Sequence, residues 1–336
     1  MRTNHKRRSI VRLMLGLALA HTPAFAQSQS WTRLADMPTA RLMAGAAAMG
    51  GKFYVIGGCV VQDKGVTALS VVEAYDPATN IWQAKAPMPT ARSSFGLAVA
   101  GGRIFVVGGT PSDTRSAINE VEAYDPVSDH WTAVAKMPTA RSQVGAAAVG
   151  GKIYAVGGNA GHELVFEVYD PVTDRWATLP PLPTARRNAG VVAIDDRLFV
   201  VGGVTPDGWT PVATLDEYDP TASRWAVRPN APIAKTDFAV TVQGGQIVVI
   251  GGFNRHALPS VEAYDPKSAK WTVRPPLPVP TQFPAAASLD GKIFVAGGTS
   301  KLPLATATLF VGDLDPMAAP MPSPAATGKH QEPSLK

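Results

Sequence analysis

The stretch that decides the fold is Met88-Pro-Thr-Ala-Arg-Ser-Ser-Phe-Gly-Leu-Ala-Val-Ala-Gly-Gly-Arg-Ile-Phe-Val-Val-Gly-Gly109, which resumes after a loop as Val121-Glu-Ala-Tyr-Asp-Pro126 and ends on Trp131. Similar units repeat along the chain, and the glycine pairs that mark them are Gly57-Gly58, Gly108-Gly109, Gly157-Gly158, Gly202-Gly203, Gly251-Gly252 and Gly297-Gly298, spaced 51, 49, 45, 49 and 46 residues apart. A repeat of about 50 residues with four strand-like segments is typical of a propeller blade. The sequence therefore predicts an all-β protein of six blades with four antiparallel strands each.

The residue choices within a unit fit the taper of a blade. The first strand uses small residues, as in Gly45-Ala-Ala-Ala48, and the second is continuously apolar, as in Phe53-Tyr-Val-Ile56. Continuous apolar runs indicate strands that are covered on both faces. A Tyr then precedes an Asp-Pro turn and a Trp at constant spacing, in the pairs Tyr75/Trp82, Tyr124/Trp131, Tyr169/Trp176, Tyr218/Trp225 and Tyr264/Trp271.

The sixth unit has no such Trp after it, whereas Trp31 stands before the first unit without a blade of its own. We therefore expect the N-terminal segment around Trp31 to complete the last blade as its outer strand. This closure removes the open sheet edge between the two ends of the chain.

The recurring Gly-Gly, Glu-Ala-Tyr-Asp-Pro and Trp are similar to the Kelch repeat, and they recur from Trp31 to Pro316. The resemblance implies a six-bladed Kelch β-propeller. The sixth unit departs from the pattern, because our alignment places Leu314 at the Tyr position and Gly312 at the Glu position.

Three segments organise the chain. In residues 1–26, basic residues precede the apolar run Leu13–Ala20, and Ala24-Phe25-Ala26 matches a small-x-small cleavage site, which indicates a cleaved export signal. Arg7-Arg8 leaves the Sec and twin-arginine routes both open. We expect the propeller to span residues 27–316, and the Pro- and Ala-rich residues 317–336 to be a disordered tail. The predicted location is the periplasm or the outside of the cell.

Charge and cysteine content exclude several classes of function. The signal holds five basic residues and no acidic one, so the remaining chain has 26 Lys and Arg against 26 Asp and Glu. Nucleic-acid binding, which needs an excess of basic residues, is therefore not expected. Cys59 is the one cysteine, so no intramolecular disulfide can form, and no Cys or His pair has metal-ligand spacing. We expect a monomer with no cofactor, no metal and no membrane insertion.

One repeat-equivalent position is basic in five units, and its residues are Arg41, Arg92, Arg141, Arg186 and Lys235, with Thr281 in the sixth. Equivalent positions form a ring in a propeller, so these groups could converge on the channel mouth and bind a carboxylate, which Arg grips with two hydrogen bonds. In that case, replacing Arg92 and Arg141 with Ala should leave stability nearly unchanged. The alternative is that the Arg belongs to the repeat itself and holds the blades together.

Two residues further on, the units differ from one another at Met43, Ser94, Gln143, Asn188, Asp237 and Phe283. Ser94, Gln143, Asn188 and Asp237 are hydrogen-bonding types and are binding candidates. Further candidates lie in loops after Gly-Gly pairs: Trp209, which is out of register with the other Trp residues, and Asn254, Arg255 and His256. Cys59 also follows a Gly-Gly pair, and we interpret it as a small buried residue rather than a nucleophile.

The sequence favours an exported module that binds a protein, peptide or glycan at the loop face around the channel. The alternative is an enzyme that resembles periplasmic Kelch proteins that interconvert the anomers of sialic acid, in which Arg holds the carboxylate and an acid/base residue moves a proton. Asp237 is the only ionisable base candidate in the second ring, so we assign no catalytic residue and lean away from an enzyme.

Overall fold

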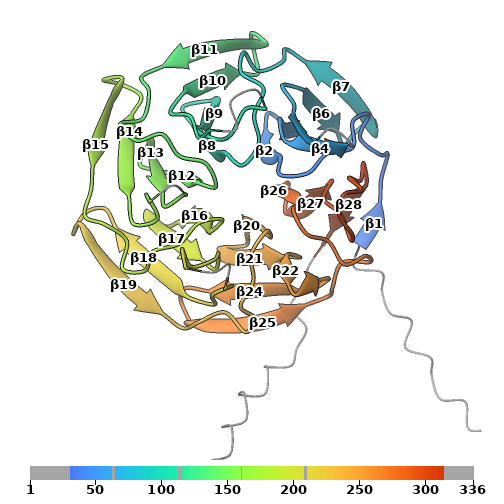
Figure 1. Cartoon of the computed structure of the whole chain (residues 1–336). Coiled ribbons are helices and arrows are strands. Elements are labelled where there is room, and N and C mark those ends of the chain that lie inside the picture. The colour runs from blue at the N-terminus through green and yellow to red at the C-terminus, as the bar shows by residue number, and fades with distance from the viewer. Residues whose placement is uncertain (1–30, 63–64, 113–115, 160, 208–209, 314–336) are drawn as a thin grey trace, which may run out of the picture.

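The computed structural model describes residues 31–62, 65–112, 116–159, 161–207 and 210–313. The predicted signal and tail lie outside these residues, as does Trp209. Within them, six four-stranded antiparallel sheets surround a central axis (Figure 1). No helix of the described residues is long and apolar enough to cross a membrane.

In blades one to five the strands follow chain order from the axis outward, and in blade six the outermost strand comes from the N-terminal segment. Blade one contains β2 (Gly45–Met49), β3 (Lys52–Ile56), β6 (Val72–Asp76) and β7 (Ile81–Lys85). Blade two contains β8 (Gly96–Ala100), β9 (Arg103–Val107), β10 (Val121–Asp125) and β11 (His130–Val134). Blade three contains β12 (Gly145–Val149), β13 (Lys152–Val156), β14 (Phe166–Asp170) and β15 (Arg175–Thr178).

The second half repeats this order. Blade four contains β16 (Gly190–Ile194), β17 (Arg197–Val201), β18 (Leu215–Asp219) and β19 (Arg224–Arg228). Blade five contains β20 (Ala239–Gln243), β21 (Gln246–Ile250), β24 (Val261–Asp265) and β25 (Lys270–Arg274). Blade six contains β26 (Ala285–Leu289), β27 (Lys292–Ala296), β28 (Leu309–Gly312) and β1 (Trp31–Arg33). Two small hairpins, β4 (Cys59–Gln62) with β5 (Gly65–Ala68) and β22 (Phe253–Asn254) with β23 (His256–Ala257), follow the Gly-Gly pairs of blades one and five.

The predicted ring closure is confirmed. β1 pairs antiparallel with β28, and Trp31 lies opposite Gly312. The Trp31 indole donates to the Pro275 carbonyl of blade five at 3.1 Å. The other blade Trp residues do the same to their preceding blades, as Trp131 does to Ala86 at 2.9 Å. Each indole therefore joins two blades by a hydrogen bond as well as by its apolar area.

The register of β28 corrects our alignment of the sixth unit. Gly312 pairs with both Trp31 and Ile293, as Tyr75 pairs with Trp82 and Phe53 in blade one, so Gly312 occupies the Tyr position. A Cβ at Gly312 would lie 2.8 Å from the Trp31 ring, so the missing side chain makes room for the closing Trp. The Glu position is occupied by Phe310, which pairs with Val295 as Glu73 pairs with Val55.

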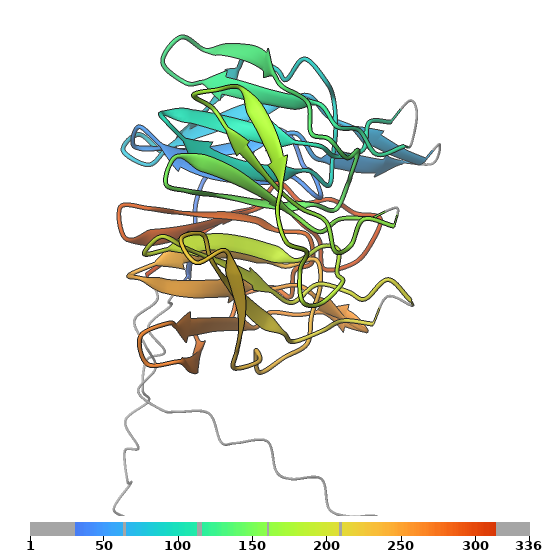
Figure 2. The ribbon, with the colours of Figure 1, turned by 90° about the vertical axis from the view of Figure 1, so that its left-hand side faces the viewer.

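Packing near the axis explains the small residues of the first strands. A Cβ at Gly96 would lie 2.7 Å from the Cβ of Ala146 in the next blade. The second strands are almost fully buried, as the pattern of β9 shows, while the outer strands are largely exposed. The core is thus a set of layers between blades, and the loops stand on the two faces of the disc (Figure 2).

Candidate functional site

The segment that leads from the outer strand of one blade to the inner strand of the next carries two sets of repeat-equivalent residues. The basic ring consists of Arg41, Arg92, Arg141, Arg186 and Lys235, and the second ring consists of Met43, Ser94, Gln143, Asn188, Asp237 and Phe283. In an antiparallel blade, the turn between strands one and two and the turn between strands three and four lie at one end of the strands. The Gly-Gly loop between strands two and three lies at the other end, and so does this connecting segment. This face is called the loop face below.

The basic ring is buried and neutralised. The exposed fractions of Arg41, Arg92, Arg141 and Arg186 are 0 to 1%, and that of Lys235 is 2%. Each forms an ion pair with an acidic residue on the third strand of its own blade, and the pairs are Arg41–Glu73, Arg92–Glu122, Arg141–Glu167, Arg186–Asp216 and Lys235–Glu262.

Arg141 illustrates how the pair is built. Its Nη2 lies 2.6 Å from Glu167 Oε2, while Nη1 donates to the carbonyls of Gly157 at 2.6 Å and Val165 at 3.0 Å. Thr139 Oγ1 donates to the other Glu167 oxygen at 2.8 Å. Burial lowers the pKa of the Arg141 guanidinium, and the charge of Glu167 opposes that effect.

These contacts correct the expectation that the guanidinium groups converge on the channel mouth. The side chains point into their own blades, and the backbone of the same residues links neighbouring blades. The second glycine of each pair donates to the carbonyl of this residue in the next blade, in the bonds Gly58–Arg92, Gly109–Arg141, Gly158–Arg186, Gly203–Lys235, Gly252–Thr281 and Gly298–Arg41. The ring therefore serves the blades, although its side chains bond within a blade rather than to the neighbour.

Blade six shows that the ion pair is present or absent as a unit. Thr281 replaces the cation, and Phe310 replaces the anion. An unpaired buried charge would cost several kcal/mol, so loss of one partner requires loss of the other.

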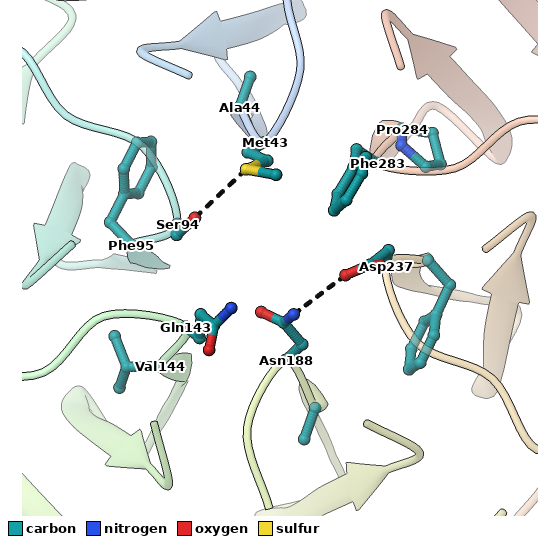
Figure 3. A pocket seen from close by; sticks show the side chains of 12 residues that line it. Met43, Ala44, Ser94, Phe95, Gln143, Val144, Asn188, Asp237, Phe283 and Pro284 are labelled. Carbon is teal, nitrogen blue, oxygen red and sulfur yellow. Dashed lines mark hydrogen bonds between the residues drawn. The ribbon is translucent and has the colours of Figure 1, made fainter. Parts of the chain in front are cut away.

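The second ring is what lines the channel mouth. Met43, Ser94, Gln143, Asn188, Asp237 and Phe283 all have φ between 52° and 56° and surround a cavity of about 230 Å³ (Figure 3). Neighbouring members are linked through their backbones, as where Gln143 N donates to Ser94 O at 2.7 Å and Phe283 N donates to Asp237 O at 2.6 Å. The left-handed backbone is thus common to all blades while the side chains differ.

A positive φ at Met43 or Phe283 is uncommon outside Gly, Asn and Asp, and it costs about 1–2 kcal/mol per residue. It turns these six side chains toward the axis, where Figure 3 shows them facing one opening. The four predicted polar members of this ring are therefore brought together. Sequence reasoning aligned Met43 and Phe283 with them but missed both as site residues, together with the wall residues Phe95 and Phe238. The position after the ring is Phe in two units, which was the available signal.

Asp237 is the one ionisable residue among the twelve described residues that line the cavity. Asn188 Nδ2 donates to its Oδ1 at 3.0 Å, and Thr236 Oγ1 reaches the same oxygen at 3.3 Å. Burial raises the pKa of Asp237 to about 6, against a smaller lowering by the Thr236 hydroxyl.

Two grooves on the loop face share lining residues with this cavity. One, of about 450 Å³, is shared by Asp237 and Phe283 with His256 and Lys301. The other, of about 380 Å³, lies under the β4–β5 hairpin and includes Ser94 and Gln143. Of the residues that line the first groove, the sequence analysis named Asp237 and His256 as binding candidates.

The remaining loop candidates, Asn254, Arg255 and His256, differ in whether they contact the blade or line a groove. Asn254 Nδ2 donates to the Ala234 carbonyl at 2.9 Å, which gives it a local structural contact. Arg255 is exposed with φ of 63° and is not among the residues that line these cavities. His256 is exposed and lines the groove beside Asp237.

Cys59 is completely buried, and burial raises its pKa to about 11, so the thiol is not activated. This agrees with its interpretation as a small core residue. Among the described residues, no group of three or more His, Cys, Asp or Glu side chains is arranged to hold a metal ion.

The comparisons with known proteins agree with this architecture. A model of the KLHDC2/KLHL20/DRC7 Kelch-repeats domain matches residues 24–158, and a Kelch-motif model matches residues 140–183, 185–232 and 234–278. The chain belongs to the Kelch-repeat family. Kelch-like protein 41b of Danio rerio is 43% identical over 83 residues, covering 25% of this chain and 13% of that protein. Beta-scruin of Limulus polyphemus is 39% identical over 85 residues, covering 25% of this chain and 9% of that protein.

These relatives are much longer than the segments they share with this Kelch chain. A likeness over nearly the whole fold comes from the solved structure of YjhT, with a TM-score of 0.70 at 15% identity, covering 82% of this chain and 95% of that one. At this identity the likeness concerns the fold alone.

Proposed function

We propose that this Kelch propeller is an exported binding module that holds a segment of a protein partner at the loop face, over the channel mouth. The observation that carries the proposal is the second ring, in which one backbone conformation in six blades presents six different side chains to one cavity. A regular scaffold with variable inward side chains can be specific for a ligand while its blades keep one architecture.

The size and chemistry of the surface support a peptide segment. The central cavity has room for one side chain, and the two grooves that share residues with it lie over blades one to three and five to six. Amides and hydroxyls of the ring can pair with a peptide backbone, while Phe283 and Met43 offer apolar contact.

The burial of the basic ring weighs against the sialic-acid enzyme. That resemblance requires an accessible Arg for the carboxylate, and the four ring Arg side chains are already committed to buried carboxylates. A glycan is the competing ligand for these grooves, whose linings are mostly apolar. For the location, the signal-like residues 1–26 support the periplasm or the outside of the cell.

The test is a selection of random peptides displayed on phage against the protein lacking residues 1–26. Selected peptides should bind the variant Gln143→Gly/Asn188→Gly at least tenfold more weakly, because glycine removes both side chains and tolerates φ near 53°. The matched control is Asp196→Gly, at an exposed position with φ of 58° on the opposite face. Equal binding to the ring variant and to the control would refute the proposal.

A further inference from the structure

The charge of the central cavity is opposite to the one that the sequence suggests. The five ring cations that would attract an anion are each paired with a carboxylate inside a blade. What remains at the mouth is the carboxylate of Asp237, surrounded by neutral side chains.

The carboxylate also keeps one oxygen available. Both hydrogen bonds that it accepts from described residues, from Asn188 and Thr236, go to Oδ1, and Oδ2 accepts none from them. A hydrogen bond from a cationic donor to this carboxylate oxygen would be charge-assisted and therefore stronger than one between neutral groups.

The neighbouring groups would accept further hydrogen bonds. Because Asn188 Nδ2 donates to Asp237, its Oδ1 is left to act as an acceptor. Phe283 is adjacent to Asp237 in the ring, and Figure 3 shows its ring and the carboxylate facing the same opening. A cation above an aromatic face gains about 0.5–2 kcal/mol, more where water is excluded.

We propose that the central cavity binds a cationic side chain of the partner, a Lys ammonium or an Arg guanidinium, between Asp237 Oδ2, Asn188 Oδ1 and the Phe283 ring. This inference rests on the proposed function and names the chemical group that enters the cavity. Exposed Lys301 lines the adjoining groove together with Asp237 but does not line the central cavity.

The probes are Nα-acetyl-lysine methylamide, the same compound acetylated on Nε, and Nα-acetyl-glutamate methylamide. Titration into the ¹⁵N-labelled protein should shift the backbone amides of Asn188 and Phe283 with the lysine probe. We expect the acetylated probe to bind at least tenfold more weakly and the glutamate probe to produce no shift at these amides.

Two variants separate the contributions. Asp237→Asn keeps the size and the left-handed backbone, and it should weaken lysine binding at least tenfold, whereas the matched control Asp196→Asn, with φ of 58° on the opposite face, should not. Phe283→Leu should weaken binding severalfold and keep the preference for the charged probe. Should the acetylated probe bind as well as lysine, or Asp237→Asn bind unchanged, the inference is wrong.

The two proposals can fail separately. Selected peptides that require Gln143 and Asn188 but lack basic residues, and that bind Asp237→Asn normally, would overturn the cationic ligand and leave the binding module standing. If no substitution in the second ring changed the binding of the selected peptides, both proposals would be refuted.

Discussion

The buried ion pair of blade three offers a quantitative test of the structural role of the basic ring. The perturbation transplants the sixth-blade pair, Thr281 and Phe310, into blade three as Arg141→Thr, Glu167→Phe and the double variant. Arg141→Thr strands the Glu167 carboxylate, whose exposed fraction is 1%, and breaking a buried pair costs about 3–5 kcal/mol.

The double variant still lacks the hydrogen bonds that Arg141 donates to two backbone carbonyls. Val165 O also accepts from Gly157 N at 2.9 Å, so it keeps a donor, whereas Gly157 O loses the one at 2.6 Å. An unsatisfied buried carbonyl costs about 1–3 kcal/mol. The single variant should therefore lose roughly 5 kcal/mol and the double roughly 1–3 kcal/mol, although it carries one more substitution.

The assay is urea unfolding followed by Trp fluorescence, with Arg175→Thr as the control. Arg175 is exposed on β15 of the same blade, and its replacement should change the free energy of unfolding by less than about 0.5 kcal/mol. If the double variant lost the sum of the two single losses, or if Arg141→Thr cost less than about 1 kcal/mol, the pair would not be the structural unit that we infer. A cost of less than about 1 kcal/mol for Arg141→Thr would also restore the earlier expectation that Arg92 and Arg141 can be replaced without loss of stability.

Four further outcomes are expected. Gly312→Ala should destabilise the closure by about 1–3 kcal/mol, because its Cβ would lie 2.8 Å from the Trp31 ring; an unchanged melting temperature would contradict this packing. Cys59, with a pKa of about 11, should react with Ellman's reagent at pH 8 at least about 100-fold more slowly when folded than in urea, and rapid labelling of the native protein would disprove its burial. Folding raises the pKa of Asp237 from 3.8 to about 6, so the contribution of this group to stability is present below pH 3.8 and is lost as the pH rises through 6. Between pH 4 and pH 8, the free energy of unfolding of Asp237→Asn should therefore rise by up to about 3 kcal/mol relative to that of the native protein. Unfolding at both pH values measures this difference, and a pH-independent difference would exclude the effect. For the proposed export, N-terminal sequencing of protein from the cell envelope or medium should begin at or near Gln27, and an intact N-terminus in the cytoplasm would reject it.

The blade architecture was predictable from sequence because it repeats. A strand pattern seen once is ambiguous, but six units with Gly-Gly, five of which continue with Tyr-Asp-Pro and Trp in fixed order, leave one arrangement. The missing sixth Trp identified the segment around Trp31 as the closing strand. The register of that strand was not predictable, because Gly312 and Phe310 depart from the pattern at the positions that define it.

The direction of the ring side chains was also beyond the sequence. Arg141 and Gln143 are two residues apart in a segment without regular strand geometry, so their spacing does not tell which faces the axis. The left-handed φ of 54° at Gln143 decides it, and a Gln gives no sign of that conformation. The partner of Arg141 did leave a trace, since an acidic residue recurs on the third strand of five units and is absent from the unit that has Thr281.

On the proposed function, the basic ring stabilises the propeller and the second ring determines its specificity. The cations that recur are neutralised within single blades, so they place no net charge at the mouth and constrain no ligand. The side chains that vary are held by a common backbone and make few contacts that a blade needs, so one of them, Asp237, can set the charge of the whole cavity. We therefore expect a single substitution at this ring to change which ligand the cavity accepts, because residues of all six blades line it.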